Sequence, residues 1–416
     1  MDFFVIDGGR PLRGTVRVSG SKNAALPILV ATLLTDDVCT IHNVPDLRDI
    51  RTTVRLLEQL GKSVTHARGV VTVRPRQKIK TRAPYELVKQ MRASVLVAGP
   101  LLARFGRAQV ALPGGCTIGL RPIDIHLDGF RRLGAAVSTE HGDVVLTADR
   151  LSAREVRFRF PSVGATENLM MAAAHIPGAT TLRNAALEPE IADLADFLTR
   201  MGARVTGAGS STVVIHGTRT LHGAEHWVIP DRVEAGTFLL AAAATHGDVR
   251  LVGAWAEHLT SLIEALRRSG ARVSDGPGGL RLRGPARPKP VDVRTEPYPG
   301  FPTDLQAPWM AYMCLARGRS RIREEVFENR FMHAAELARM GARIVTDGAK
   351  AVVEGVAALN GAPIMASDIR AGAALIVAGL AAQGQTLIQR VYHVDRGYER
   401  IEKKLRALGA RIRRAH

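Results

Sequence analysis

A short phrase that recurs six times, at intervals of roughly 70 residues, constrains the fold more than any other feature. Each copy is the end of an amphipathic helical segment, then a glycine, a small or basic residue and a short β-branched strand. Glycine suits the position after a helix because it adopts a left-handed backbone without steric cost. The period exceeds that of solenoid repeats, so each unit is predicted to be a small layered module. The six copies are 60–64, 133–137, 201–205, 269–273, 340–344 and 408–412.

Upstream of these phrases lie helical segments made of small apolar residues, as at 168–174, 236–245 and 371–382. They are apolar nearly all round, which predicts that they are buried in the centre of a module. A strand usually follows, so the order within a unit is helix, strand, helix, strand, strand. We expect an α/β fold of two similar three-unit domains, the first 22–229 and the second 1–21 plus 230–416. The chain would cross between them near Gly20–Ser21 and near Pro230–Asp231.

Bulk composition agrees with two domains, because 416 residues are too many for one ordinary core. Three cysteines, far apart and odd in number, argue against a disulfide framework and for a reducing compartment. The first residues read as a strand and a turn, not as a signal peptide, and no apolar run is long enough to span a bilayer. We therefore expect a soluble cytoplasmic protein.

The net charge of +18 admits three kinds of partner: nucleic acid, an acidic membrane surface or small anionic substrates. A solvated basic surface is an equally simple interpretation. Aromatic residues are only 5% of the chain, which is a thin supply for stacking single-stranded bases. The 13 histidines show no zinc-binding spacing, and no G-x-G-x-x-G follows a strand, so neither a metal nor a dinucleotide cofactor is expected.

The segment 113–122 places the lone thiol of Cys116 among three glycines, five residues before Arg121. Such a loop can open and close, and a nearby guanidinium favours the thiolate and lowers the pKa of the cysteine. Cys116 is therefore a candidate acid, base or nucleophile. A tight turn that carries a small buried cysteine is the alternative.

Further candidates stand at predicted helix starts. Lys22 and Asn23 precede an apolar helix expected from Ala24, and the segment 162–168 precedes one expected from Leu169; both could bind an anion or simply cap the helix. Asp304, after a proline-rich turn, could be a general base or an N-cap. If the repeat holds, six cations occupy equivalent junctions that face one cleft between the domains: Lys22, Arg92, Arg121, Arg330, Arg370 and Arg396.

Taken together, these motifs resemble the UDP-N-acetylglucosamine 1-carboxyvinyltransferase family of enolpyruvyl transferases, over essentially the whole chain. The likeness is carried by 20–27, 113–126, 162–168, 301–306, 326–333 and 395–399. It implies an inside-out α/β barrel in each of two domains, with the active site in the cleft between them. It also implies enolpyruvyl transfer from phosphoenolpyruvate to the 3′-hydroxyl of UDP-N-acetylglucosamine, without a cofactor, as the first committed step of peptidoglycan synthesis.

The resemblance assigns roles residue by residue. Phosphoenolpyruvate would be held by Lys22, Asn23, Arg121, Arg370 and Arg396. Cys116 would protonate its methylene carbon, form an adduct and react with fosfomycin; Asp304 would take the proton of the sugar hydroxyl, with Asp368 close to the reacting carbon. The UDP-sugar would be held by Arg92, Arg121, Pro122, Ile123, Asp124, Ile125, Ser162, Val163, Gly164, Asp304 and Val326.

Two residues depart from the family pattern: Arg48 stands where lysine is frequent, and Phe160 where some members carry lysine. Both concern the affinity for anions and not the reaction. Two other functions stay open. A related enzyme could transfer enolpyruvyl to another acceptor, such as shikimate 3-phosphate, although 121–125 argues against it. A basic six-unit protein could also bind RNA without catalysis, which Cys116 and Asp304 disfavour.

Overall fold

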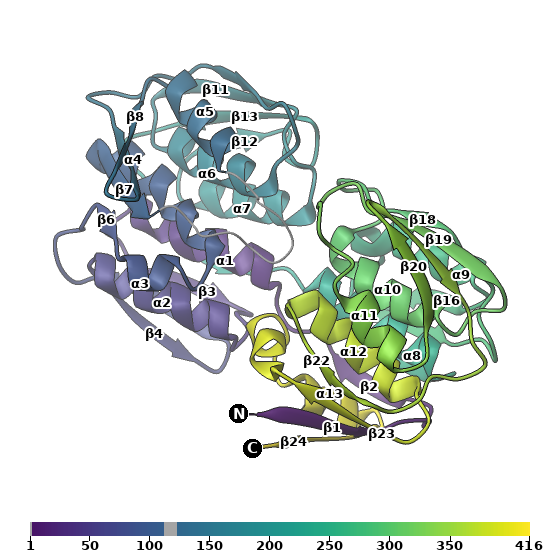
Figure 1. Cartoon of the computed structure of the whole chain (residues 1–416). Helices are drawn as coiled ribbons and strands as arrows, with labels where there is room; N and C mark the ends of the chain where they lie inside the picture. Colours follow the sequence, from purple (N-terminus) through teal and green to yellow (C-terminus); the bar gives the residue numbers. More distant parts are fainter. Residues whose placement is uncertain (1, 112–122) are drawn as a thin grey trace. The chain divides into compact units, whose positions relative to one another are not determined.

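The computed structural model describes residues 2–111 and 123–416, and the chain forms two compact units (Figure 1). Unit 1 contains Met1–Ser19 and Pro230–His416, and unit 2 contains the chain from Gly20 to Ile229 apart from part of the undescribed segment. Gly20 and Ser21 thus belong to unit 2, although we expected them in the other domain. The reason is local, because the Ser21 N–H donates to the Ile229 carbonyl at 2.7 Å and its side chain caps the first helix of unit 2.

Within the described residues, unit 2 has three apolar helices, α1 (Lys22–Ala31), α4 (Ala98–Phe105) and α6 (Val163–Ala174). Its other helices are α2 (Arg48–Leu60), α3 (Tyr85–Val88), α5 (Asp124–Arg132) and α7 (Pro189–Arg200), with 3₁₀ turns η1 (Thr32–Leu34) and η2 (Arg92–Val97). Its strands are β3 (Cys39–His42), β4 (Lys62–Ala67), β5 (Val70–Pro75), β6 (Arg82–Ala83), β7 (Arg107–Ala111), β8 (Ala136–Glu140), β9 (Asp143–Thr147), β10 (Glu155–Arg157), β11 (Gly178–Arg183), β12 (Arg204–Thr206), β13 (Thr212–Gly217) and β14 (Glu225–Trp227).

Unit 1 repeats this plan with apolar helices α8 (Arg232–Ala244), α10 (Gln306–Met313) and α12 (Ile369–Ala381). Its other helices are α9 (Thr260–Arg268), α11 (His333–Arg339) and α13 (Ile401–Ala407), with 3₁₀ turns η3 (Ala256–Leu259), η4 (Thr303–Leu305) and η5 (Val391–Arg396). Its strands are β1 (Phe3–Asp7), β2 (Arg13–Arg17), β15 (Asp248–Val252), β16 (Arg272–Gly276), β17 (Gly279–Arg283), β18 (Val293–Arg294), β19 (Arg319–Arg323), β20 (Arg343–Asp347), β21 (Lys350–Glu354), β22 (Pro363–Met365), β23 (Gln385–Gln389) and β24 (Arg411–Ala415).

The strands of the described residues form six four-stranded sheets, three in each unit. Each sheet contains the three antiparallel strands that the repeat predicts, plus a fourth strand that pairs in parallel at one edge. We did not predict this edge strand, because most copies are only two or three residues long and show no alternation of polar and apolar side chains. In unit 1, β1 completes the sheet that contains β23 and β24, as expected of the N-terminal strand.

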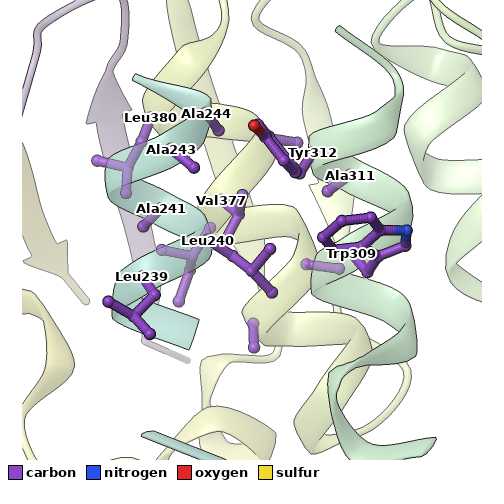
Figure 2. Close-up of a cluster of buried hydrophobic side chains, with 14 of the residues drawn as sticks. Leu239, Leu240, Ala241, Ala243, Ala244, Trp309, Ala311, Tyr312, Val377 and Leu380 are labelled. Carbon is purple, nitrogen blue, oxygen red and sulfur yellow. The ribbon is translucent and has the colours of Figure 1, made fainter. Parts of the chain in front are cut away.

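The apolar helices form the centre of each unit. In unit 1, α8, α10 and α12 pack on one another, and Figure 2 shows Leu240 of α8, Trp309 of α10 and Val377 of α12 in this cluster. Small residues permit the close packing: a Cβ on Gly236 would lie 2.5 Å from Leu305 Cδ1. Because these helices are buried along most of their length, most of their side chains contribute packing. No helix in the described part of the chain is long and apolar enough to cross a membrane.

The six recurring glycines all adopt the left-handed backbone that the sequence pattern requires. Their φ angles are 117° at Gly61, 103° at Gly134, 109° at Gly202, 97° at Gly270, 90° at Gly341 and 91° at Gly409. Each lies between an outer helix and the strand that follows it, so the chain reverses at these points. The predicted helix-to-strand turn is confirmed at all six sites.

Replacing Gly409 by alanine is expected to destabilise unit 1 by about 1 kcal/mol, because an L-residue is strained in the left-handed region. A Cβ at Gly409 would meet no described atom within 4 Å, so the effect isolates the backbone conformation. Urea unfolding followed by circular dichroism measures it. Gly276→Ala is the matched control, since its Cβ would also meet nothing within 4 Å and its φ is not positive. Equal effects of the two substitutions would contradict the explanation.

Candidate active site

Polar side chains gather at the N-terminal ends of the apolar helices. In unit 2, Ser21 and Ser162 cap α1 and α6, their hydroxyls accepting from Ala24 N and Ala165 N at 3.3 Å. In unit 1, Asp231 and Asp368 cap α8 and α12, each carboxylate accepting two backbone N–H groups at 2.8–3.0 Å. These caps start the helices earlier than we predicted. α1 begins at Lys22 instead of Ala24, and α6 at Val163 instead of Leu169, because Lys22 and Asn23 in α1, and Gly164 and Thr166 in α6, interrupt the apolar pattern of the first turns.

Asp304 lies in η4, just before α10, and does not cap that helix. Its Oδ1 accepts from Arg330 Nη2 at 2.7 Å, and its Oδ2 accepts from Arg370 Nη2 at 2.7 Å. The arginines are buried, with side chains 5% and 7% exposed, whereas the carboxylate is 28% exposed. Burial raises the pKa of Asp304, but the charges and hydrogen bonds of Arg370 and Arg330 outweigh burial and hold it well below its usual value. The N-cap alternative is therefore wrong, and the carboxylate is an ionised group clamped between two cations.

The clamp is continued by hydroxyl groups that the sequence analysis missed. Arg370 Nη1 donates to the Tyr398 hydroxyl at 3.3 Å, and that hydroxyl lies 2.9 Å from Thr237 Oγ1. Thr237 in turn donates to the Val233 carbonyl at 2.8 Å within α8. The chain of contacts fixes the Arg370 guanidinium from two sides. Tyr398 is 1% exposed. In the sequence it is marked only by its place in the 395–399 motif.

Glu324 supports the clamp from behind. This carboxylate is 2% exposed, and its Oε1 accepts from the Thr295 and Thr303 hydroxyls at 2.8 and 2.9 Å and from the N–H groups of Val326 and Phe327 at 3.0 and 3.1 Å. Thr303 Oγ1 also accepts from Arg330 Nη1 at 3.1 Å. One buried side chain thus orders both the turn before Asp304 and the segment that contains Val326.

In unit 2, the candidate phosphoenolpyruvate residue Lys22 occupies the first turn of α1. Its Nζ lies 3.6 Å from Asp49 Oδ2, and both side chains are largely buried. Asn23, beside it, is partly exposed. A buried ammonium at a helix N-terminus adds its charge to the helix dipole, so this end of α1 is suited to an anion.

Two helices that carry candidate nucleotide-sugar residues of unit 2, α5 and α6, meet at His126. Asn168 Nδ2 lies 3.1 Å from His126 Nδ1, while its Oδ1 accepts from Gly99 N at 2.7 Å. A Cβ on Gly164 would lie 3.3 Å from His126 Cε1, so the start of α6 approaches the start of α5 closely. Burial lowers the pKa of His126 to about 4, with help from the charge of Arg92, so the ring is neutral near pH 7.

The other candidate site residues lie in ordinary core or surface positions. Ile123 is buried, Ile125 packs against the core of unit 2, and Asp124 starts α5 and pairs with Arg159. Arg48 is the first residue of α2, and Phe160 is 38% exposed. Cys116, Arg121 and Pro122 lie outside the described residues.

The expectation that the six cations occupy equivalent junctions is wrong for the five that the structure describes. Lys22 and Arg370 lie in first turns of apolar helices, and Arg92 begins η2, which leads into α4. Arg330 and Arg396 instead precede the outer helices α11 and α13. The repeat therefore supplies cations at two different kinds of helix start. Among the described residues, no group of three or more His, Cys, Asp or Glu side chains is arranged to hold a metal ion.

Glu324→Ala is expected to lower the free energy of unfolding by about 2–4 kcal/mol, because it leaves buried hydroxyl and N–H donors without an acceptor. Glu324→Gln should lose much less, since an amide oxygen at the Oε1 position can still accept all four bonds. Chemical denaturation of the three proteins side by side measures this. An alanine variant as stable as the parent would show that Glu324 does not organise this region.

The fold matches that of known enolpyruvyl transferases. The family model described as EPSP synthase (3-phosphoshikimate 1-carboxyvinyltransferase) matches residues 6–405. The crystal structure of the enolpyruvyl transferase NikO from Streptomyces tendae superposes with a TM-score of 0.91 and 28% identity, covering 100% of this chain and 99% of that one. An EPSP synthase from Acinetobacter baumannii shares the fold, with a TM-score of 0.77 and 18% identity over 100% of both chains. The predicted α/β fold of two domains with repeated helix and strand units is confirmed.

Closer relatives narrow the assignment. A UDP-N-acetylglucosamine 1-carboxyvinyltransferase from Anaeromyxobacter sp. (strain Fw109-5) is 57% identical, covering 100% of this chain and 99% of its own length. One from Elusimicrobium minutum is 54% identical, covering 99% of this chain and 98% of its own length. The chain belongs to the EPSP synthase family of enolpyruvyl transferases and, within it, to the UDP-N-acetylglucosamine 1-carboxyvinyltransferases.

Proposed function

We propose that this protein transfers the enolpyruvyl group of phosphoenolpyruvate to the 3′-hydroxyl of UDP-N-acetylglucosamine and releases phosphate. The reaction is an addition followed by an elimination through a tetrahedral ketal, and it begins peptidoglycan synthesis. The observation that carries the proposal is the clamp of Asp304 between Arg330 and Arg370, at 2.7 Å on each side. It puts a carboxylate that can accept a proton beside a guanidinium that can bind a carboxylate or phosphate. The names of the full-length relatives support the choice of acceptor.

In the proposed addition step, Asp304 removes the proton of the sugar hydroxyl as its oxygen bonds to the central carbon of phosphoenolpyruvate. With both arginines attached, the low pKa of Asp304 makes it a weak base. We infer that Arg370 turns to the phosphoenolpyruvate carboxylate when that substrate binds. The pKa of Asp304 then rises, because one of its two cationic partners is now shared. Substrate binding thus activates the base, which Arg330 and Thr303 keep in place.

Protonation of the methylene carbon is assigned to Cys116, with Arg121 and Arg396 on the phosphate and Lys22 and Asn23 completing the anion site. The ketal then loses phosphate as a proton leaves the methyl group, which restores the enol ether in the product. Fixed cations stabilise the phosphate in both steps. The scheme uses no metal or organic cofactor.

The UDP-sugar is assigned to a larger set of residues, and the contacts around His126 support the part of it in unit 2. The set comprises Arg92, Arg121, Pro122, Ile123, Asp124, Ile125, Ser162, Val163, Gly164, Asp304 and Val326. Asp368 is proposed to lie near the reacting carbon, held by its bonds to the first turn of α12. The free thiols of Cys39 and Cys314 suit a reducing compartment, so we place the reaction in the cytoplasm.

The deciding assay is phosphate release from phosphoenolpyruvate, measured with and without UDP-N-acetylglucosamine. Release that depends on this acceptor supports the proposal. Release only with shikimate 3-phosphate would identify the other acceptor class, and binding to RNA with no release would identify a non-catalytic protein.

Fosfomycin is expected to alkylate Cys116 and to leave Cys39 and Cys314 untouched. Burial raises the pKa of both other thiols, that of Cys314 to about 12, so neither offers a thiolate near pH 7. Peptide mass mapping after treatment locates the adduct. Cys116→Asp should retain turnover, since a carboxylic acid can also deliver the proton, whereas Cys116→Ser should lose most of it. Adducts at the other thiols would contradict the assignment of Cys116 as the proton donor.

Asp304→Asn is expected to lower kcat roughly 10²–10⁴-fold, because asparagine cannot accept the proton. Both arginines then lose a charged partner, so a loss of about 2 kcal/mol in stability is also expected. Turnover is therefore measured per folded molecule. Asp143→Asn is the control, since Asp143 also accepts from an arginine, Arg82, but starts β9 on an outer sheet. Unchanged kcat in the Asp304 variant would rule this residue out as the base.

A further inference from the structure

The solvent face of one outer sheet of unit 1, in the order β16-β17-β15-β2, is hollowed and rich in arginine. A depression of about 710 Å³ lies over these strands and the turn at 275–279, and a second of about 530 Å³ shares Arg281 with it. The only carboxylates among their lining residues are Asp248 and Asp275. We call this region the arginine face, and its six arginines are Arg13, Arg250, Arg267, Arg272, Arg281 and Arg283.

Cross-strand pairing on this face places like charges opposite one another. Arg250 of β15 lies directly opposite Arg281 of β17, and Arg272 of β16 lies opposite Arg283 of β17. Like charges directly opposite in an antiparallel pair are destabilising. Asp248, which lies opposite Arg283 and pairs with both Arg281 and Arg283, balances part of this repulsion. One carboxylate cannot balance all the arginines of the two rows, so the rows keep an excess of positive charge that a bound anion would offset.

The guanidinium groups are held in place rather than free to turn. Arg281 donates to both oxygens of Asp248 at 2.8 Å, and Arg283 Nε donates to the same carboxylate at 2.7 Å. Arg250 Nη2 donates to the Pro277 carbonyl at 2.7 Å. Arg13, opposite Asp248 on β2, forms no ion pair within the described part of the chain. Groups fixed in this way lose little conformational entropy when they bind an anion.

The equivalent sheets of unit 1 show that the repeat does not require this arrangement. In the sheet β18-β19-β21-β20, Arg319 and Arg343 both lie opposite Glu354, while Arg323 lies opposite Lys350 and pairs with Glu325. In the sheet β22-β23-β1-β24, Arg411 lies opposite Asp7. Arg319, Arg343 and Arg411 thus face carboxylates, whereas Arg250 faces Arg281.

We propose that the arginine face binds a small polyanion that carries at least two phosphate groups, at a site separate from the proposed active site. The planar guanidinium fork fits phosphate oxygens, and a depression of this volume suits a discrete small molecule. None of the large hydrophobic side chains that the described residues expose belongs to this face. It therefore offers neither an anchor for a membrane nor a platform for stacked bases.

Inorganic pyrophosphate is the probe, titrated calorimetrically into the full-length protein at about physiological salt, where surface charge is screened beyond roughly 8 Å. The double variant Arg250→Gln/Arg281→Gln should lose one binding site per chain or at least about tenfold in affinity there. Arg319→Gln/Arg343→Gln removes the same charge from the equivalent sheet and should bind like the parent. Equal losses of pyrophosphate affinity in both double variants would show that binding depends only on net charge. No loss of affinity in Arg250→Gln/Arg281→Gln would refute the site.

Two further readouts separate this site from catalysis and from misfolding. Without pyrophosphate, Arg250→Gln should raise the urea midpoint of unfolding, because it removes a like-charge pair. The Arg250→Gln/Arg281→Gln variant should also keep the parent kcat in the phosphate-release assay. A lower midpoint for Arg250→Gln would contradict the repulsion on which the proposal rests, and loss of turnover in the double variant would contradict a separate site.

Discussion

The structure of each unit depends on helices that are apolar on every side. Such a helix cannot lie at a surface, so three of them pack together and the sheets cover them, as α8, α10 and α12 do in unit 1. Most of their side chains are apolar, and polar ones such as Thr237 of α8 are few. Charged groups are favoured at the ends, where unsatisfied N–H groups need partners. The constraint that makes the core therefore also collects serines, aspartates and cations at the helix starts.

The clamp at Asp304 shows how charges collected at the helix starts affect both stability and reactivity. Two buried guanidiniums need a carboxylate, and Asp304 provides it from a partly exposed position. The same pairing depresses its basicity, so the resting state is stable and unreactive. If an anionic substrate takes one guanidinium, the base is released without any large movement of the backbone. Glu324 and Thr303 hold Arg330 and the turn in place, so the proposal takes Arg370 as the partner that exchanges.

Local rules in the sequence predicted the repeating frame well but not the contacts that build the site. Gly409 and its five counterparts each predict a left-handed turn without help from distant residues. The order of helices and strands follows from these turns. The parallel edge strands are too short to show a period. The sequence predicts the starts of α1 and α6 after Lys22 and Val163, because polar residues in α1 and a glycine and a threonine in α6 interrupt the apolar pattern. Glu324 and Tyr398 meet their partners only through folding, and no local pattern marks such residues.

The high arginine content serves two different physical purposes in this chain. Arg330 and Arg370 are desolvated and paired, so their energy depends on geometry and little on salt. The arginines on the outer sheets are exposed, and their combined field raises the local concentration of small anions around the whole molecule. Where a carboxylate lies opposite, as Glu354 does for Arg319, that field is locally cancelled. On the arginine face, Asp248 and Asp275 are the only carboxylates among the lining residues, so the field of its six arginines is cancelled less completely.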